Sequence, residues 1–313
     1  MVEDQAFKEY LHRRINQWFR AHARDLPWRA DDRTGWSVMV SEFMLQQTPV
    51  VRVLPIWEQW MQRWPTPADL AAADTAEVIR AWGRLGYPRR ALRLHAAATA
   101  IVEEHGGEVP EDYETLLALP GVGSYTAAAI TVFAFGHRAT VIDTNIRRVF
   151  ARAVSGKALP AKSLTAAETR LANELMPADD REAVTWNAAT MELGALICTA
   201  KSPKCEACPV QEKCAWIAAG RPEPEYQPKG QEWAGTDRQL RGAIMAVLRE
   251  STGPVHSEVL LSGGKAAQRY RAEAVPALEK LVKLNSPAEQ LERCLTSLAT
   301  DGLIRREGDL ISL

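Results

Sequence analysis

The sequence predicts a mostly helical protein that ends in a small domain of mixed helix and strand. Apolar residues recur every three or four positions in AFKEYLHRRINQWF (6–19) and AEVIRAWGRL (76–85), which is the period of an amphipathic helix. Proline and glycine separate such segments, and strands do not alternate with them, so the pattern argues against a parallel sheet. With 313 residues, the chain is long enough for about two domains.

The helical part is expected to cover residues 1–218. Residues 219–235, AGRPEPEYQPKGQEWAG, carry three prolines and three glycines with little apolar content, a composition typical of a linker. We therefore expect a separate C-terminal domain over residues 236–313.

Within that domain, DRQLRGAIMAVLRE (237–250) and AEQLERCLTSLAT (288–300) have the apolar period of helices. Two short strand-like runs follow, LIRRE and DLISL, with Gly308 between them. This order resembles a winged helix. A small helical appendage is the alternative interpretation.

Charge and hydropathy narrow the class of protein. The 38 Lys and Arg nearly balance the 39 Asp and Glu, which excludes a uniformly basic coat for nucleic acid but not a local basic face. No uncharged apolar run reaches ~18 residues, so no transmembrane helix is expected. The N-terminus MVEDQAFKEYLHRR lacks the apolar centre of a signal peptide. We expect a cytoplasmic protein.

Cysteine spacing indicates a metal or cluster site. Four of the five cysteines lie close together as Cys198-x6-Cys205-x2-Cys208-x5-Cys214. Four thiolates in a short segment suit zinc or an iron–sulfur cluster. A zinc ribbon usually has two C-x2-C pairs, and this segment has one. Cys294 stands apart and is expected to be a buried, unreactive thiol.

The segment LPGVGSYTAAAI (119–130) places Pro-Gly-x-Gly between two helical segments. Gly121 and Gly123 permit a tight turn and a close approach of the backbone. The following helix offers free N–H groups at its N-terminus, where phosphate binds readily. An ordinary packing joint between two helices is the alternative.

A helix–hairpin–helix followed by this cysteine loop resembles the endonuclease III superfamily of DNA glycosylases. Further stretches are similar to the MutY family of adenine DNA glycosylases: LPWR (26–29), SEFMLQQT (41–48), LGYPRRALRLH (85–95) and MELGALIC (191–198). The resemblance runs from about residue 10 to residue 217.

This resemblance implies a helical core of two subdomains, with the helix–hairpin–helix at about 113–135 and the cluster loop at 198–214. It implies a 4Fe–4S cluster on the four cysteines, with zinc as the alternative. It also implies a monomer near the nucleoid whose partner is double-stranded DNA with a mispaired adenine.

Two carboxylates are candidates for cleavage of a glycosidic bond. Glu42 lies in VMVSEFMLQQ, where apolar neighbours would raise its pKa and keep a proton available as general acid. A solvated helix face is the alternative. Asp143 precedes the helical NIRRVFARAV and suits a helix N-cap. The resemblance makes Asp143 the anion that stabilises the positively charged sugar, with Asn145 beside it. Thr144 replaces the glycine that is common in the family.

Tyr125 decides the expected type of reaction. Endonuclease III-like relatives have a lysine at this hairpin position, whose amine forms a Schiff base and cuts the strand. A tyrosine cannot form an imine, and MutY-like proteins have Ser or Tyr there. We therefore expect a monofunctional glycosylase that uses water, unless Tyr125 only packs the hairpin.

Other site residues are implied by the resemblance alone. Arg29, Leu45 and Glu192 correspond to positions around the flipped adenine. Gln47 and Tyr87 correspond to residues that probe the base stack near the opposite base. Each of them has ordinary packing as its alternative.

Arginines in two regions are candidates for contacts with DNA phosphate, although a solvated charged face is the usual explanation of such runs. In the core they are Arg84, Arg89, Arg90, Arg93, Arg147 and Arg148. In the C-terminal domain they are Arg238, Arg241, Arg305 and Arg306.

Two further functions remain open. One is a thymine or uracil mismatch glycosylase on the same scaffold, against which Glu42 argues. The other is a non-catalytic, cluster-bearing DNA-binding protein that senses redox state. Classical MutY proteins end in a Nudix-like domain that reads 8-oxoguanine, and residues 236–313 are short for one. The sequence therefore does not predict how strictly the opposite base is recognised.

Overall fold

The computed structural model describes residues 4–227, 230, 232–273 and 275–313. The chain forms two compact units: unit 1 is Met1–Phe43 with Glu103–Pro228, and unit 2 is Met44–Val102 with Lys229–Leu313. The sequence had suggested a boundary at a linker over 219–235. The chain passes from unit 1 to unit 2 inside that segment, and the C-terminal residues group with the helices of residues 44–102.

The regular elements described in the first 218 residues are all helices, as predicted. In chain order they are α1 Gln5–His22, η1 Pro27–Arg29, α2 Gly35–Leu45, α3 Val50–Arg63, α4 Pro67–Ala71, α5 Thr75–Trp82, α6 Arg89–His105, α7 Tyr113–Ala118, α8 Ser124–Phe133, α9 Thr144–Ala153, α10 Ala166–Glu174, α11 Asp180–Leu196, η2 Cys205–Ala207, η3 Gln211–Lys213 and α12 Ala215–Ala218. Within the described residues, no helix is both long enough and apolar enough to span a membrane.

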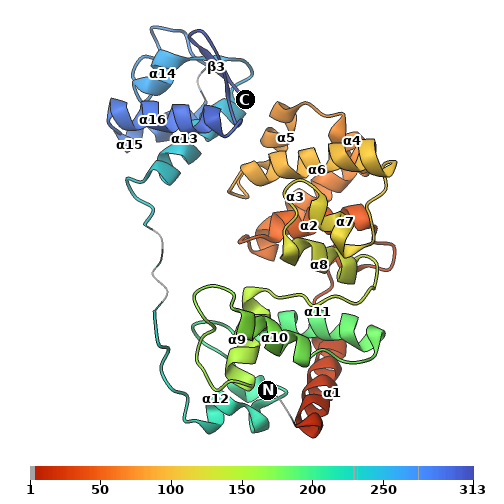
Figure 1. The fold of residues 1–313 in the computed structure, drawn as a ribbon. Coiled ribbons are helices and arrows are strands. Elements are labelled where there is room, and N and C mark those ends of the chain that lie inside the picture. Colours follow the sequence, from red (N-terminus) through yellow and green to blue (C-terminus); the bar gives the residue numbers. More distant parts are fainter. Residues whose placement is uncertain (1–3, 228–229, 231, 274) are drawn as a thin grey trace. The chain divides into compact units, whose positions relative to one another are not determined.

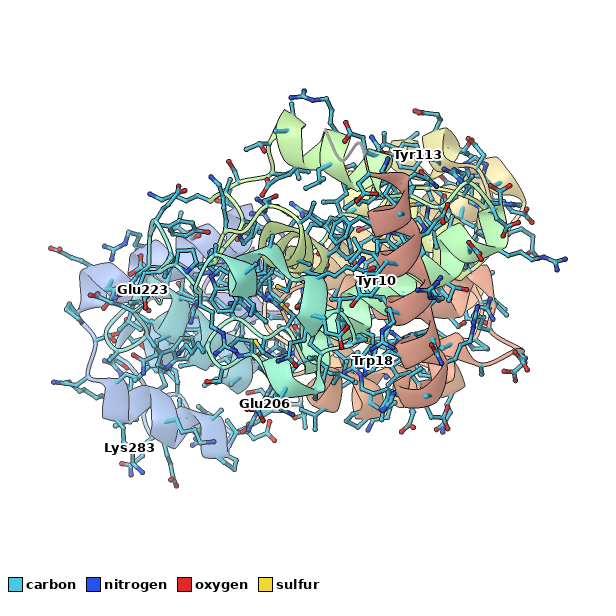
Figure 2. All side chains as sticks on the ribbon, turned by 90° about the horizontal axis from the view of Figure 1, so that it is seen from below. Tyr10, Trp18, Tyr113, Glu206, Glu223 and Lys283 are labelled. Atoms are coloured by element: carbon cyan, nitrogen blue, oxygen red, sulfur yellow. The ribbon has the colours of Figure 1, made fainter. Side chains whose placement is uncertain are left out.

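The core of unit 1 is built where α1 and α9 pack against α11 (Figure 1). The ring of Trp186 on α11 lies 6.0 Å from Phe150 on α9 and 4.8 Å from His12 on α1, measured between centroids. Tyr10 and Trp18 project from the same helix α1 (Figure 2). These apolar contacts fix α9 and α11, the two helices that carry Asp143 and Glu192.

The C-terminal part of unit 2 combines helices with a small sheet. Its elements are α13 Asp237–Glu250, β1 Val255–His256, α14 Ser257–Leu261, α15 Pro276–Leu284, α16 Ala288–Thr300, β2 Arg305–Glu307 and β3 Leu310–Ser312. The two predicted helices are confirmed, and Gly308 turns the predicted hairpin with a φ of 59°. Strand β1 adds to β3 and makes the antiparallel order β1-β3-β2.

This C-terminal part shares its apolar core with α5. Ile79 is 1% exposed and lies in the same buried cluster as Leu248. Arg80 Nη2 donates to the backbone oxygen of Ser251 at 3.1 Å, and Arg249 Nε donates to that of Ile79 at 3.3 Å. Removal of the C-terminal part would therefore uncover Ile79.

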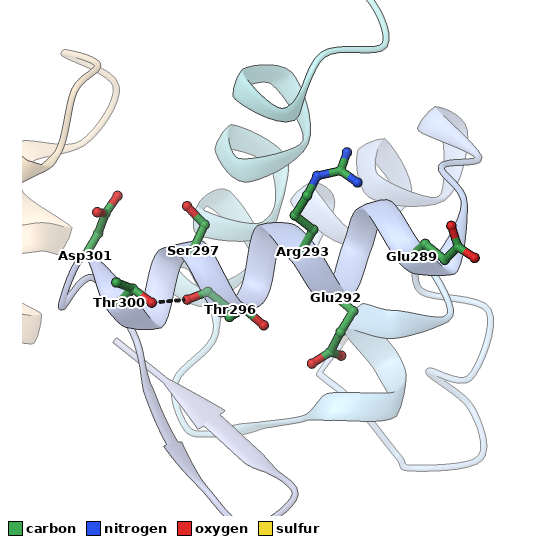
Figure 3. Close-up of a pocket in the computed structure, with 7 residues that line it drawn as sticks. All are labelled: Glu289, Glu292, Arg293, Thr296, Ser297, Thr300 and Asp301. Carbon is green, nitrogen blue, oxygen red and sulfur yellow. Dashed lines mark hydrogen bonds between the residues drawn. The ribbon is translucent and has the colours of Figure 1, made fainter.

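The arginines predicted to hold phosphate in this part have intramolecular partners. Arg241 pairs with Asp301 at 2.5 Å and Arg306 with Glu292 at 3.0 Å. Figure 3 shows Glu292 on α16 and Asp301 directly after the helix, with Glu289 one turn from Glu292. Two more arginines are engaged elsewhere: Arg305 donates to Thr75, and Arg238 lies over the ring of Trp233. The surface of α16 is therefore mixed in charge and does not favour phosphate.

We predict that Ile79→Asp will loosen the C-terminal part of the intact protein. A buried isoleucine lost from such a core costs about 2–5 kcal/mol, and the added charge costs more. Amide hydrogen exchange in α13 should therefore rise and the thermal midpoint should fall. Val51→Asp is the control, because Val51 is 79% exposed on α3. Unchanged exchange in Ile79→Asp would show that α5 does not hold this part.

Candidate active site

The hairpin between α7 and α8 forms as the sequence predicted (Figure 1). Asp112 caps α7 by accepting from the amides of Glu114 and Thr115. Gly121 has a φ of 76°, the left-handed region that favours glycine, so its role in the turn is confirmed. Gly123 is extended, and a Cβ there would meet nothing within 4 Å. The N-terminus of α8 thus lies open, without a capping side chain.

Helix α8 also brings Tyr125 to Glu42. Glu42 sits near the end of α2 and is 5% exposed, so the predicted apolar surroundings are confirmed. The Tyr125 hydroxyl donates to Glu42 Oε2 at 2.9 Å. Burial raises the pKa of Glu42 to about 7, the charge of Asp143 adds to this, and the Tyr125 hydrogen bond opposes it. The Glu42 carboxyl therefore holds a proton near neutral pH.

Asp143 is the N-cap of α9, as its sequence position suggested. Its Oδ1 accepts from the amide of Ile146 at 2.6 Å, and its Oδ2 accepts from Asn145 Nδ2 at 2.7 Å. Burial outweighs these N–H donors and the charge of Arg148, so the pKa of Asp143 is raised above its ordinary value. Asp143 lies at the positive end of a helix and has two donors, so it is the better anion of the two carboxyls.

Glu192 on α11 is fully buried and is held by two arginines. Oε1 accepts from the Arg24 amide and Nε, and Oε2 accepts from Arg24 Nη2 at 2.7 Å and Arg29 Nη2 at 3.1 Å. Burial alone would raise the pKa of Glu192, but these arginines outweigh it and lower the pKa to about 2. Glu192 is thus a fixed anion, and a hydrogen bond to a base requires one arginine to give way.

Asp143 is joined to the cysteine loop through hydrogen bonds. Asn145 Oδ1 accepts from Arg148 Nη2 at 2.8 Å, and Arg148 Nε donates to the backbone oxygen of Cys198 at 2.6 Å. Gly194 allows α11 to pack closely against α9, because a Cβ at this position would lie 2.7 Å from Asn145 Cβ. The position of Asp143 therefore depends on how the cysteine loop is held.

The four cysteines of that loop surround one pocket. Cys198, Cys205, Cys208 and Cys214 line it together with apolar side chains. Arg152 Nη1 lies 3.5 Å from Cys198 Sγ, where its charge offsets that of a thiolate. Four sulfurs around one pocket, with a cation beside them, fit an anionic iron–sulfur cluster.

The predicted stack-probing residues lie in unit 2. Gln47 follows α2 and is exposed, and Tyr87 precedes α6 and is 49% exposed. Both have positive φ, 55° and 47°. Leu45 ends α2 and is half-buried. Arg89 begins α6 and pairs with Asp301 at 3.2 Å, with 56% of its side chain exposed.

Three of the predicted phosphate-binding arginines are bonded within the protein: Arg147 is half-buried, and Arg148 and Arg90 are buried. Arg147 Nη2 donates to the backbone oxygens of Ala161 and Ser163 and to Glu168 at 2.8 Å, so it braces the segment before α10. Arg148 and Arg90 are 6% and 5% exposed and bond chiefly to backbone oxygens. A phosphate contact by Arg147 would have to break its ion pair, so the structure does not support that prediction.

Arg24 and Arg152 were missed by the sequence analysis. Neither stands out in the sequence, because their partners, Glu192 and the cysteine loop, are far along the chain. The buried glutamate and the thiolates were the available signals, since buried anions require nearby cations.

Comparison with known proteins now places the chain. Residues 40–174 match the HhH-GPD superfamily of base excision DNA repair proteins, and residues 198–214 match the iron–sulfur binding domain of endonuclease III. Together with the fold and the site, these matches define a helix–hairpin–helix DNA glycosylase of base excision repair. The predicted 4Fe–4S cofactor is confirmed by the second match.

Individual relatives narrow this class. The adenine DNA glycosylase of Mycolicibacterium smegmatis is 47% identical over 293 residues, which cover 93% of this chain and 92% of the relative. That of Mycobacterium tuberculosis is 45% identical over 293 residues, covering 93% and 89%. The human adenine DNA glycosylase is 44% identical over 63% of this chain and 37% of its own length. The chain belongs to the adenine DNA glycosylase family.

Solved structures agree on the fold. A thermostable thymine-DNA glycosylase superimposes with a TM-score of 0.61 at 28% identity and covers 68% of this chain and 97% of its own. An endonuclease III–DNA covalent intermediate superimposes with a TM-score of 0.60 at 22% identity, covering 71% and 100%. The predicted helix–hairpin–helix core is thus confirmed.

We predict that Glu42→Gln will abolish most activity while stabilising the protein at alkaline pH. Loss of a general acid lowers the rate ~10²–10⁴-fold. The pKa of Glu42 is about 7 in the folded protein, above the ordinary 4.5, so ionisation of this carboxyl destabilises the folded state. The destabilisation is absent below about pH 4.5, grows as the pH rises and is complete above pH 7. The variant should gain on the order of 3 kcal/mol at pH 8.5 and much less at pH 5.5.

Denaturant unfolding at both pH values measures this gain, and single-turnover assays measure the rate. Glu104→Gln, an exposed glutamate on α6, is the control and should change neither quantity. Equal stability of wild type and Glu42→Gln at pH 8.5 would contradict a buried, proton-holding Glu42.

We also predict that Cys208→Ser will lose iron, visible absorbance and most soluble yield, because the loop has little apolar material of its own. Cys294→Ala should keep all three, since Cys294 is buried in the C-terminal part, outside the loop. Iron analysis and absorbance spectra of protein purified without oxygen provide the measurement. A colourless wild type with stoichiometric zinc would overturn the assignment.

Proposed function

We propose that the protein removes adenine mispaired with 8-oxoguanine or guanine from double-stranded DNA by hydrolysis of its N-glycosidic bond. The observation that carries the proposal is the pairing of Glu42, which holds a proton, with Asp143, which has two N–H donors, in one buried site. The names of the relatives support adenine as the base.

The chemistry follows from these two environments. Glu42 gives its proton to a ring nitrogen of the base, so the base leaves with the electron pair of the C1′–N bond as a neutral molecule. The sugar becomes positively charged at C1′, and the Asp143 carboxylate stabilises that charge. Water then adds to C1′, and its proton passes to a carboxylate, which leaves an abasic sugar.

Tyr125 supports a reaction that ends at this stage. Its hydroxyl donates to Glu42, and burial raises its pKa far above the ordinary range, so it remains a neutral donor. It offers no amine to attack C1′. Strand cleavage through a Schiff base is therefore not expected from the hairpin.

Recognition of the base is assigned to Arg29 and Glu192. Arg29 Nη1 is buried and has no hydrogen-bond partner among the described residues, so it can donate to a ring nitrogen. Glu192 can accept from an exocyclic amino group if Arg24 shifts. A purine edge with an acceptor next to a donor, as in adenine, matches this pair.

We infer that a DNA phosphate binds at the open N-terminus of α8, where backbone amides can donate to it. A non-covalent endonuclease III–DNA complex, which shares the fold, supports DNA as the partner. A monomeric state and a cytoplasmic location beside the nucleoid stay predictions from the sequence.

Thymine release is the second candidate function, because a thymine-DNA glycosylase shares the fold at 28% identity.

Duplexes that differ in one base pair test the proposal. The protein is incubated with adenine opposite 8-oxoguanine, guanine, cytosine or thymine, and with a G:T duplex, and alkali then reveals abasic sites. We expect breaks at adenine opposite 8-oxoguanine and guanine, and none without alkali. Borohydride in a parallel reaction should trap no adduct. Release of thymine but not adenine, or efficient trapping, would refute the proposal.

A further inference from the structure

The guanidinium of Arg90 lies buried between two loops of unit 2. One loop, residues 46–49, follows α2, and the other, residues 83–88, precedes α6. Arg90 itself is the second residue of α6 and is 5% exposed. Burial lowers its pKa to about 10, so it is still charged at neutral pH.

Both loops are bonded to this single side chain. Arg90 Nη1 donates to the backbone oxygens of Met44 at 3.0 Å and Gln46 at 2.6 Å. Arg90 Nη2 donates to Thr48 Oγ1 at 3.0 Å and to the backbone oxygen of Gly86 at 3.0 Å. Only a planar fork of several N–H groups reaches acceptors on both sides at once.

The two loops carry the exposed residues with unfavourable backbone. Gln47 lies between the bonded Gln46 and Thr48, and Tyr87 follows the bonded Gly86. Their φ values of 55° and 47° cost a non-glycine residue about 1–2 kcal/mol each. Such conformations persist only where neighbouring contacts hold them. The hydrogen bonds of Arg90 lie on the residues adjacent to both.

Arg90 also supports the Tyr87 ring directly. Its guanidinium carbon lies 5.7 Å from the centre of the Tyr87 ring and 5.2 Å from that of Trp82. Thr48 Oγ1 donates to the backbone oxygen of Leu85 at 3.1 Å and ties the loops together a second time. Arg90 thus contacts one face of the Tyr87 ring, while 49% of Tyr87 stays exposed.

From this arrangement we propose that Arg90 is a positioning residue for base extrusion, because it holds Gln47 and Tyr87 ready to enter the base stack together. The inference rests on the proposed function, in which a base leaves the stack. It gives Arg90 a task other than the phosphate contact suggested by the sequence. Side chains that replace lost stacking work best when they are ordered before they meet DNA, since ordering them afterwards costs affinity.

Arg90→Lys tests the inference, because lysine keeps the charge and loses the fork. Ile101→Ala is the matched control for stability, since Ile101 is buried on the same α6 and touches neither loop's hydrogen bonds. Single-turnover rates are measured on adenine opposite 8-oxoguanine in two duplexes. One is continuous, and in the other mismatched neighbours have already unstacked the adenine.

We expect Arg90→Lys to slow the continuous duplex about 10–100-fold and the unstacked duplex less than about 3-fold, because only the first needs full extrusion. Ile101→Ala should slow both by the same small factor. Equal slowing of both duplexes by Arg90→Lys would reduce Arg90 to a structural role and overturn the inference.

A second measurement reports extrusion without chemistry. In a Glu42→Gln background, a 2-aminopurine placed next to the target adenine brightens when its stacking is broken. At saturating protein we expect a smaller gain of fluorescence with Arg90→Lys than with arginine, and an unchanged gain with Ile101→Ala. An equal gain in all three would overturn the inference. A wild type that releases no adenine would instead refute the proposed function.

Discussion

The burial of the Glu42 carboxyl beside a second carboxyl is the constraint on which the site depends. An acid that must hold a proton near neutral pH needs an apolar place, and α2 provides it at the cost of folding free energy. The Tyr125 hydroxyl donates a hydrogen bond to this carboxyl. Burial raises the pKa of Asp143 as well, but two N–H donors at a helix N-terminus oppose that rise. Different hydrogen-bond partners are how two neighbouring carboxyls can divide the roles of acid and anion.

Helix α9 connects Asp143, at its N-terminus, to the cysteine loop. Its first turn presents Asp143, and its later turns present Arg148 and Arg152, whose donors go to the loop's backbone and to Cys198 Sγ. A loop with little apolar content cannot hold itself in place by burial. A cluster held by the four cysteines would fix this loop, and Arg148 connects the loop to Asn145, beside Asp143.

Patterns among neighbouring residues predicted most of the helices, but they could not predict contacts between residues far apart in the chain. The period of apolar residues placed α13 and α16 at their observed bounds, and the neighbours of Glu42 predicted its burial. Strand β1, two residues long, has no period to detect. The composition of residues 219–235 indicated a connecting segment, but it could not indicate that Ile79 packs with residues 170 positions away. The match with the Mycolicibacterium smegmatis relative, 47% identical, covers 93% of the chain and so extends into this C-terminal part.

The arginines show most clearly where sequence reasoning stops. Arg89 and Arg90 are neighbours with the same charge, yet one is exposed at the start of α6 and the other is buried between two loops. Whether a guanidinium meets phosphate or backbone oxygens depends on which carbonyls the folded chain leaves without partners. Loops with left-handed residues leave many such carbonyls, because their amides and oxygens do not pair in a helix. The strained loops around Gln47 and Tyr87 and the buried Arg90 therefore require each other: the loops supply acceptors for a buried charge, and the charge holds the loops in a shape that they would otherwise leave.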